Sequence, residues 1–396
     1  MNILQITPRL PFPPNDGGAV YIYYTTKYLS RLGHNVTLAS LISNKHEQEA
    51  KALKKWATVH AVDGQFKPYS FFSAAKSLLS RSPITIQHRM KPELMRTALH
   101  AVNDTPDVVL LEGLHTAAFI DDIENIFPDS PVVLRQSNVE YLLLKRNAAT
   151  TGNPFLKAFY YDQYKLMKKY EVKAMSSVDA VTAITRFDKE LYLEHLPDLT
   201  CHVSPAGAEI PKPLGIKREK NKILAISNWR WKPNYDGLKW FLEKIWPDLI
   251  ALKPDLKLFV AGEGLNNRFQ RKFAHSSIQF LGFVDNLEPL RQSSSLFIAP
   301  LFSGSGMKLK VIEGMASGLP IITTKIGAEG IEIKNGTHYV EANSKKDFLN
   351  AILFLLDNPE KREQISRSAK QIVKEKYSWE SITGDLVDFL KTVRKS

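Results

Sequence analysis

Short runs of apolar residues recur along the chain, and each is followed by a loop and then by a stretch with helical periodicity. Runs that are apolar at nearly every position are typical of strands buried on both faces of a parallel sheet. The pattern therefore predicts an α/β fold with two doubly wound sheets, one in each half of the chain. The runs lie at 2–7, 36–39, 107–111, 131–135 and 180–184 in the first half, and at 222–226, 256–262, 278–282, 296–300 and 320–324 in the second.

The first forty residues have the order strand, loop, helix, strand. A proline-rich loop follows the first strand and ends in Gly17 and Gly18, and a helix is expected from about Ala19 to Leu32. Gly33 is suited to cap the carboxyl end of that helix. This segment is therefore a βαβ unit with a glycine turn at its strand-to-helix corner.

The strand-and-helix pattern breaks between 205 and 213, and residues 215–221 are polar and basic. Such a change of composition is typical of a domain boundary. We expect residues 1–210 to form an N-terminal Rossmann-like domain and residues 211–375 a C-terminal one. Residues 376–396 are expected to form a helix that packs back toward the N-terminal domain.

The composition of the 396 residues, 44% hydrophobic and 24% charged, is ordinary for a soluble protein. The chain has no apolar run long enough to cross a bilayer, and its start is interpreted as a strand and not as a signal peptide. The single Cys201 excludes an internal disulfide framework and fits a cytoplasmic protein. The net charge of +12 suits a phosphorylated substrate or an anionic lipid surface, but no block of like charges indicates a nucleic-acid partner.

The segment from Ser303 to Gly330 combines glycines, lysines and one glutamate between two apolar strands. Gly304 and Gly306 allow a sharp turn and a close approach of a ligand to the backbone. Lys308, Lys310 and the start of the next helix would attract phosphate, whereas Glu313 could accept hydrogen bonds from the two hydroxyls of a ribose. The pattern therefore favours a nucleotide diphosphate. The alternative is that a GxG alone is unspecific and that Lys310 and Glu313 form an ordinary surface ion pair.

The whole chain resembles the family 4 glycosyltransferases, and the glycine-rich variant of their paired-glutamate motif in particular. The resemblance is strongest at 304–320 and 327–330, and it is supported at 8–18, 31–36, 231–234 and 260–264. It implies the GT-B fold, in which two Rossmann-like domains face a central cleft. The N-terminal domain would bind the acceptor and the C-terminal domain the nucleotide sugar. The resemblance also implies transfer with retention of the anomeric configuration.

On the donor side, Glu313 resembles the second glutamate of the motif, which holds the ribose, while Ser305 stands at the position of the first. The backbone from Ser305 to Met307 would then contact the sugar, and Lys308 or Lys310 the diphosphate. Of the family's Arg/Lys pair, Lys232 is the better candidate and Arg230 the weaker one. The turn 281–284 resembles the loop that receives the base. The donor-binding residues are therefore Gly304, Ser305, Gly306, Met307, Lys310, Phe283 and Arg230.

On the acceptor side, relatives carry a histidine after the strand that here ends in Pro106-Asp-Val-Val-Leu-Leu-Glu112, which points to His115 and less strongly to Glu112. The segment 135–140 is similar to an "RxHNVE" motif in which Ser137 replaces the histidine. Its Asn138 and Glu140 are candidate site residues, or alternatively helix caps. Gly17 and Gly18 complete the acceptor-side set. The expected catalytic residues are His115, Lys232, Lys308 and Glu313.

The resemblance therefore implies a retaining glycosyltransferase that moves a sugar from a UDP or GDP sugar to a hydroxyl of a glycan or lipid-linked glycan. Since the chain has no Asp-x-Asp, we expect no metal and no cofactor. Alternatives are a GT-B epimerase or phosphorylase and a non-catalytic nucleotide-sugar-binding scaffold. A nicotinamide dehydrogenase is poorly supported, because the first loop lacks GxGxxG.

Two stretches, 65–81 and 155–169, mix aromatic, aliphatic and basic residues. They would suit peripheral contact with an anionic membrane. The alternative is that their aromatic residues pack on the core while their lysines face water.

Overall fold

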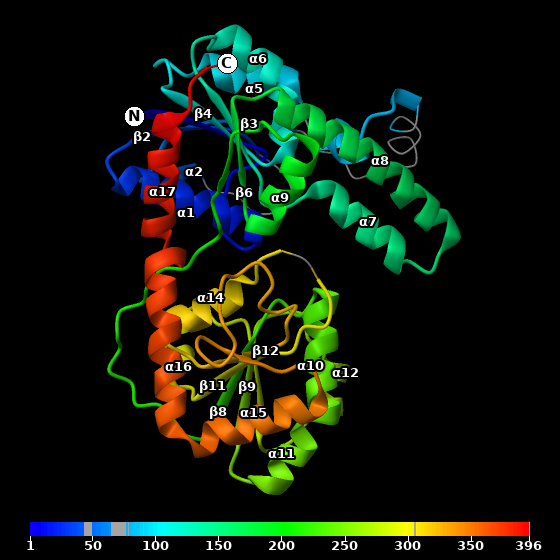
Figure 1. Ribbon diagram of the computed structural model, residues 1–396, viewed down its shortest axis with the longest axis vertical. Helices are drawn as coiled ribbons and strands as arrows, with labels where there is room; N and C mark the ends of the chain where they lie inside the picture. The colour runs from blue at the N-terminus through cyan, green and yellow to red at the C-terminus, as the bar shows by residue number, and fades with distance from the viewer. Residues whose placement is uncertain (43–49, 65–76, 78, 90, 305, 396) are drawn as a thin grey trace. The chain divides into compact units, whose positions relative to one another are not determined.

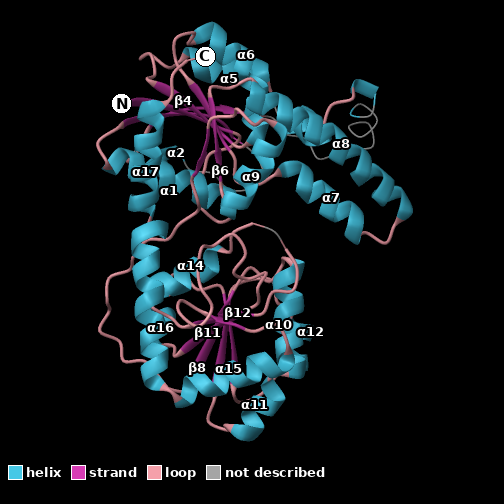
Figure 2. Ribbon diagram, in the orientation of Figure 1, coloured by secondary structure: helices cyan, strands magenta, loops and turns pink. Residues whose placement is uncertain are grey.

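The computed structural model describes residues 1–42, 50–64, 77, 79–89, 91–304 and 306–395. The chain divides into two compact units, one formed by Met1–Pro205 with Ile382–Ser396 and the other by Ala206–Ser381. Each unit has a parallel sheet with helices against both of its faces, as Figure 1 and Figure 2 show. The predicted α/β class with two doubly wound domains is confirmed.

The N-terminal unit is built on a seven-stranded sheet in the order β3-β2-β1-β4-β5-β6-β7, and every neighbouring pair is parallel. The central strand β4 is buried at all five positions, as its apolar sequence requires. The strands are β1 Asn2–Thr7, β2 Asn35–Ile42, β3 Thr58–Asp63, β4 Val108–Glu112, β5 Val132–Arg135, β6 Ala180–Ala183 and β7 Cys201–Val203.

Two apolar clusters cover the two faces of this sheet. One cluster joins Ile3, Leu38 and Val108 of the strands to helices α1, α2 and α17, and the other joins Leu4 and Leu111 to helices that include α5, α6, α8 and α9. The helices are α1 Gly17–Arg31, α2 Ala50–Leu53, α4 Ile84–Arg89, α5 Pro92–His100, η1 Leu114–Phe119, α6 Ile120–Ile126, α7 Glu140–Thr150, α8 Pro154–Ser176, α9 Arg186–His195 and α17 Trp379–Thr392.

The C-terminal unit is built on a six-stranded parallel sheet in the order β10-β9-β8-β11-β12-β13. Its strands are β8 Lys222–Ile226, β9 Lys257–Ala261, β10 Ile278–Gly282, β11 Leu296–Ala299, β12 Ile321–Thr323 and β13 Val340–Glu341. Its helices are α10 Lys232–Lys244, α11 Trp246–Leu252, α12 Asn267–Lys272, α13 Glu288–Ser293, α14 Leu309–Ala316, α15 Lys345–Asp357, α16 Pro359–Ile372 and η2 Val373–Tyr377.

Alternate residues of β8 belong to different cores, which is the two-residue period of a strand with both faces covered. Ile223 and Ala225 pack with α10, α11 and α15, whereas Leu224 and Ile226 pack with α14 and α16. The sheet is therefore held between two helical layers, and its carboxyl edge, where the strands lead into loops, is where a doubly wound fold binds ligands.

The last helix, α17, begins in one unit and ends in the other. Its Leu386, Val387 and Leu390 are buried in the cluster that contains Ile3 and Val108 of the N-terminal sheet. The final residues of the chain thus complete the core that its first residues begin.

Candidate functional site

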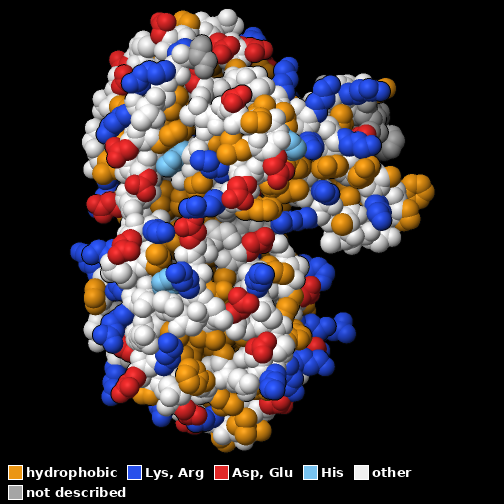
Figure 3. Space-filling model, viewed as in Figure 1, with side chains coloured by type: hydrophobic (Ala, Val, Ile, Leu, Met, Phe, Trp, Pro, Cys, Tyr) orange, Lys and Arg blue, Asp and Glu red, His pale blue; other side chains and the backbone are white. Residues whose placement is uncertain are grey.

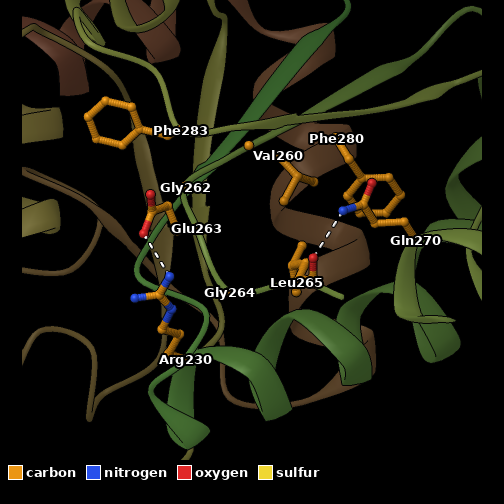
Figure 4. A pocket seen from close by; sticks show the side chains of 10 residues that line it. Arg230, Val260, Gly262, Glu263, Gly264, Leu265, Gln270, Phe280 and Phe283 are labelled. Carbon is orange, nitrogen blue, oxygen red and sulfur yellow. Dashed lines mark hydrogen bonds and ion pairs between the residues drawn. The ribbon is translucent and has the colours of Figure 1, made fainter. Parts of the chain in front are cut away.

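A pocket of about 240 Å³ lies at the carboxyl ends of β9 and β10, beside the loop that follows β8. Its lining residues, drawn in Figure 4, come from the loop after β8, from β9, β10 and the loops that follow them, and from helix α12. The location is the one that the fold predicts for a ligand. The lining residues are Arg230, Val260, Gly262, Glu263, Gly264, Leu265, Gln270, Phe280, Gly282 and Phe283.

Glycines shape the floor of this pocket because the loops approach each other closely. Gly262 has φ 115°, and a Cβ there would lie 1.8 Å from the carbonyl oxygen of Ser227. Gly264 has φ 105°, and a Cβ there would lie 2.4 Å from the backbone nitrogen of Arg230. Only glycine fits both positions without moving the backbone. The motif Val260-Ala-Gly-Glu-Gly264 therefore fixes the loop that carries Arg230.

The polar groups of the pocket face solvent and each other. Arg230 and Glu263 form an ion pair of 3.1 Å, and Gln270 Nε2 donates a hydrogen bond of 3.0 Å to the carbonyl oxygen of Leu265. Phe283 is 67% exposed and offers an aromatic face at the rim. Two sequence-predicted residues, Arg230 and Phe283, are thus brought together in one pocket. Glu263, in the loop after β9, and Gln270, on α12, were not predicted, because carboxylates and amides are common on surface loops and helices.

The glycine turn between β11 and α14 is connected to this pocket through Trp231. Gly304 has φ 123° and Gly306 has φ 71°. A Cβ on Gly304 would lie 2.8 Å from the ring of Trp231, the residue that follows Arg230. The turn and the pocket are therefore parts of one surface of the C-terminal unit. Ser305 lies outside the described residues.

The two lysines that follow the turn have different surroundings. Lys308 is 5% exposed, and its ammonium donates a hydrogen bond to the carbonyl oxygen of Gly306. The ammonium of Lys310 donates to Ser227 Oγ at 2.9 Å and to Asn234 Oδ1 at 2.6 Å. Burial, reinforced by the charge of Lys308, lowers the pKa of Lys310 to about 7. Both lysines are thus gathered at the start of α14, whose first turn has no side-chain cap.

Glu313 pairs with an arginine that the sequence did not indicate. Its carboxylate accepts a hydrogen bond from Arg291 Nη2 of α13, and Arg291 Nη1 also lies 3.8 Å from Glu288 Oε2. The alternative of an ordinary Lys310–Glu313 ion pair is therefore wrong, since each residue has a different partner. The Glu313 side chain remains 37% exposed, so the carboxylate is oriented by Arg291 and still accessible.

Two other predicted donor residues are placed less favourably. Lys232 is the first residue of α10, and its ammonium forms an ion pair with Asp236 one turn later while its side chain is 81% exposed. Arg230 lines the pocket, whereas Lys232 does not. Met307 is partly buried against the core that contains Ile312 of α14.

In the N-terminal unit, the acceptor-side candidates follow the carboxyl ends of β1 and β4. Gly17 and Gly18 are exposed and form the first turn of α1, which the Asp16 side chain caps by accepting from the backbone of Ala19 at 3.1 Å. His115 is partly buried in η1, just after Gly113, whose φ is 89°. These three residues therefore occupy strand-to-helix corners, as a ligand site in this fold requires.

Glu112 is a correction to the acceptor-side set. Its carboxylate lies 2.7 Å from Arg135 Nη1 and accepts a hydrogen bond of 2.7 Å from Gln5 Nε2, and the Glu112 side chain is only 1% exposed. The Arg135 guanidinium also lies 4.1 Å from the Tyr21 ring centroid. A buried pair of this kind needs all its partners, because removing one leaves an uncompensated charge. Glu112 therefore holds the sheet together and is not accessible to an acceptor.

The segment with Asn138 and Glu140 is fixed by a glutamate from another helix. Glu171 of α8 accepts hydrogen bonds from the backbone of Tyr141 at 3.1 Å and of Glu140 at 3.3 Å, so it caps the start of α7. Helix α7 has no side-chain cap of its own, and hence Asn138 does not cap it. Asn138 and Glu140 are both partly exposed at this corner.

Comparisons with known proteins show which family and which relatives this chain is similar to. Residues 220–358 match the family described as "Glycosyl transferases group 1", and this range includes the pocket, the glycine turn and Glu313. A Klebsiella pneumoniae protein described as an uncharacterized 44.6 kDa protein in the cps region is 23% identical over 95% of this chain and 96% of its own.

Two solved structures have a similar fold. Anabaena HepE, crystallised with UDP and glucose, has a TM-score of 0.64 at 14% identity and covers 99% of this chain and 100% of its own. WaaG, a glycosyltransferase involved in lipopolysaccharide biosynthesis, has a TM-score of 0.64 at 15% identity and covers 98% of this chain and 100% of its own.

Proposed function

We propose that this chain, a glycosyltransferase of the GT-B fold, moves a sugar from a nucleotide-diphosphate sugar to a hydroxyl group of a glycan or lipid-linked glycan. The assignment of the donor site rests on one connected surface of the C-terminal unit. On this surface the pocket beside Arg230 meets the glycine turn through Trp231. The binding of UDP and UDP-glucose by HepE supports a donor of the same chemical class.

The pocket residues would bind the nucleoside. Phe283 offers a ring for stacking, and the backbone of the loop after β10 offers polar groups to the base. Glu313, oriented by Arg291, would accept hydrogen bonds from the two ribose hydroxyls. Lys308, Lys310 and the uncapped start of α14 would bind the diphosphate, which carries the opposite charge.

We infer a retaining transfer in which the acceptor hydroxyl attacks on the face from which the nucleotide diphosphate leaves. Negative charge then grows on the phosphate oxygens, and fixed lysines stabilise it most strongly in a water-poor site. The departing phosphate accepts the proton of the acceptor hydroxyl, so no protein base is required. Because three cationic residues, Arg230, Lys308 and Lys310, belong to this surface, we propose that the reaction needs no metal.

The N-terminal unit would bind the acceptor. His115, at the corner after β4, is the residue that we propose to approach the transferred sugar. Gly17 and Gly18, together with Asn138 and Glu140, would contact the acceptor from the corners that follow β1 and β5. This assignment leaves the buried Glu112 in its structural role.

We also propose that α8 contacts an anionic membrane, which would bring a lipid-linked acceptor to the enzyme. Phe155 is 87% exposed and Leu156 47% exposed at the start of this helix. Farther along, Lys165, Lys168 and Lys169 line a shallow surface pocket together with Tyr161, Tyr164, Val172 and His195. Figure 3 shows basic and hydrophobic side chains mixed over the projection formed by α7 and α8. Exposed apolar side chains beside lysines are the combination that binds an anionic headgroup layer.

Among the described helices, none is long and apolar enough to cross a membrane. The stretch 65–81 lies almost entirely outside the described residues.

Vesicle sedimentation tests the membrane proposal. We expect binding to vesicles of phosphatidylcholine with phosphatidylglycerol, and a roughly tenfold or greater loss in the double variant Phe155→Ser and Leu156→Ser. The control is Phe354→Ser, which changes a half-exposed phenylalanine on α15 of the other unit. Equal binding by all three proteins would remove α8 from the membrane contact.

Calorimetry without metal tests the donor site. We expect one of UDP, GDP, ADP and CMP to bind best to the wild type, and Glu313→Ala to lose about 2–4 kcal/mol, roughly thirty-fold to thousand-fold in affinity. Glu360→Ala, which changes an exposed glutamate on α16, is the matched control.

The sugar derivative of the best-bound nucleotide should then be turned over by the wild type, with release of the nucleoside diphosphate. Binding without turnover would favour a scaffold protein, and an isomerised sugar nucleotide would favour an epimerase.

A further inference from the structure

Lys310 is a partly buried cation whose hydrogen-bond partners are neutral. Its ammonium donates to the Ser227 hydroxyl at 2.9 Å and to the Asn234 side-chain oxygen at 2.6 Å. No described carboxylate forms an ion pair with it, whereas two buried cations of the sheets, Arg135 and Lys222, are paired with Glu112 and Glu219. Buried charges in proteins are ordinarily paired, so the neutral setting of Lys310 requires an explanation.

The orientation of the Asn234 amide is fixed by a second hydrogen bond. Asn234 Nδ2 donates to the carbonyl oxygen of Asn228 at 2.8 Å, and Asn234 is 7% exposed. Because the amide nitrogen is already used in this way, the amide oxygen must point at Lys310. Asn228 in turn accepts, through Oδ1, a hydrogen bond of 3.0 Å from the backbone of Arg230. The lysine is therefore tied to the loop that lines the pocket.

We propose that Asn234 and Ser227 are positioning residues that hold the Lys310 ammonium with neutral oxygens, so that the nucleotide diphosphate supplies its counter-charge. The inference rests on the proposed function and extends it, since it assigns a role to two residues outside the donor-binding set. An aspartate at 234 would be nearly isosteric but would provide an anion in advance and repel the diphosphate. Asparagine therefore keeps the lysine available for the ligand.

A consequence is that diphosphate binding takes up a proton. The charged side chain that faces Lys310 is Lys308, and the groups from the β8 loop and from α10 are the neutral Ser227 and Asn234. With its pKa lowered to about 7, Lys310 is only about one-tenth protonated at pH 8 in the empty site. A diphosphate beside it would favour the ammonium form, so binding at this pH should draw most of one proton from the buffer.

The test is titration calorimetry at pH 8 in Tris and in HEPES, whose ionisation enthalpies differ, with UDP, GDP and ADP as probes. For the best-bound diphosphate, the wild type should show a heat difference between buffers that corresponds to proton uptake. Asn234→Asp should bind at least about tenfold more weakly and show little uptake, because its lysine is already charged. Lys310→Arg should also show little uptake, since arginine stays protonated.

Asn350→Asp makes the same chemical change at an exposed position of α15 and should behave like the wild type. Asn234→Ser keeps a neutral oxygen and should retain more of the affinity and the proton uptake than Asn234→Asp does. Thermal unfolding of each variant shows whether the fold is intact. Equal affinity and equal proton uptake in the wild type and a folded Asn234→Asp would overturn the positioning role while leaving the donor site standing. Absence of diphosphate binding by the wild type would overturn both.

Discussion

Glu171 shows how a single buried side chain organises a corner of the N-terminal unit. It lies between α8 and the start of α7 and accepts hydrogen bonds from two backbone amides and from Gln136 Nε2 at 3.1 Å. Burial, with a smaller contribution from Glu140, raises its pKa to about 8 in spite of these hydrogen bonds. The carboxyl group is therefore largely protonated at neutral pH, where an ordinary glutamate is charged.

This raised pKa predicts a pH-dependent stability. Between pH 4.5 and 8 the folded state binds the Glu171 proton and the unfolded state has lost it, so stability falls as pH rises through this window. Relative to Glu171→Gln, the wild type should lose roughly 2–4 kcal/mol of unfolding free energy between pH 5 and pH 8. Urea unfolding at both pH values measures this difference. Glu190→Gln, an exposed change on α9, should show no such trend, and a constant difference for Glu171→Gln would contradict the assignment.

Arg291 gives a second prediction at the scale of the residue. If Arg291 orients Glu313 toward a ribose, then Arg291→Gln should weaken binding of the preferred nucleoside diphosphate by about 1 kcal/mol, roughly fivefold. The same variant should have little effect on the 2′,3′-dideoxy analogue, which lacks the hydroxyls. Calorimetry with both ligands tests this, and Arg367→Gln serves as an exposed-arginine control. An equal loss for both ligands would mean that Arg291 acts on something other than the ribose.

The two glutamates at 112 and 313 show what the sequence can and cannot give for single residues. Both follow apolar runs in suggestive motifs, yet Glu112 is buried with Arg135 and Glu313 is accessible beside Arg291. Burial depends on partners that are distant in sequence: Arg135 and Gln5 for one, and Arg291, 22 residues away, for the other. The Asn234–Lys310 contact, across 76 residues, is invisible to spacing for the same reason.

At the scale of the element, the turn before α14 has two functions. Gly304 adopts a left-handed conformation and also gives space to the ring of Trp231, so the turn both shapes the corner that we propose for the diphosphate and contacts the loop that lines the pocket. The glycine spacing in the sequence predicts the sharp turn, and its role toward a diphosphate stays a prediction. The second function depends on a tryptophan more than seventy residues earlier in the chain.

Gly304→Ala should therefore damage binding more than stability. A Cβ at this position costs about 1–2 kcal/mol for the backbone conformation alone and would also displace Trp231. We expect weaker diphosphate binding by roughly tenfold or more, measured by calorimetry. Gly384→Ala is the matched control, because this α17 glycine has open space around it and alanine is the better helix former. Unchanged affinity in Gly304→Ala would mean that the turn does not touch the donor.

Elements with strong patterns were predicted well, and edge elements were not. Fully buried strands such as β4 and β8 appear in the sequence as nearly continuous apolar runs. The missed strands were β3, β7 and β13, which lie at or near sheet edges, are partly exposed and, for β13, are only two residues long. Such strands are defined by their neighbours in the sheet and carry little signal of their own.

At the scale of the whole molecule, the fold class followed from ten apolar runs, and the family resemblance supplied the GT-B architecture. Each unit has its own sheet and its own cores, so each can be treated as a separate source of stability. The exception is the final segment, Ile382–Ser396, which belongs to the N-terminal unit although it follows the C-terminal one in sequence.

Removing that segment should therefore affect the two units unequally. A chain that ends at Ser381 lacks Leu386, Val387, Leu390 and Val393, all buried against the N-terminal sheet. Each lost apolar side chain costs about 2–4 kcal/mol, so the four losses together approach the total stability of a typical domain. Hydrogen exchange should show β1, β2 and β4 losing protection while β8 and β9 keep theirs. A chain that ends at Arg394 is the control, and equal loss in both units would show that they unfold together.

The division of the N-terminal unit between the two ends of the chain also sets an order for events on the ribosome. Residues 1–205 emerge from the ribosome before the helix that closes their apolar core is translated. The continuous segment 206–381 can fold while the earlier half still exposes Ile3 and Val108. Synthesis of this protein would thus reverse the usual N-terminal-first sequence of domain folding. A nascent chain would pass through a stage in which the C-terminal unit is folded and the N-terminal unit still lacks helix α17.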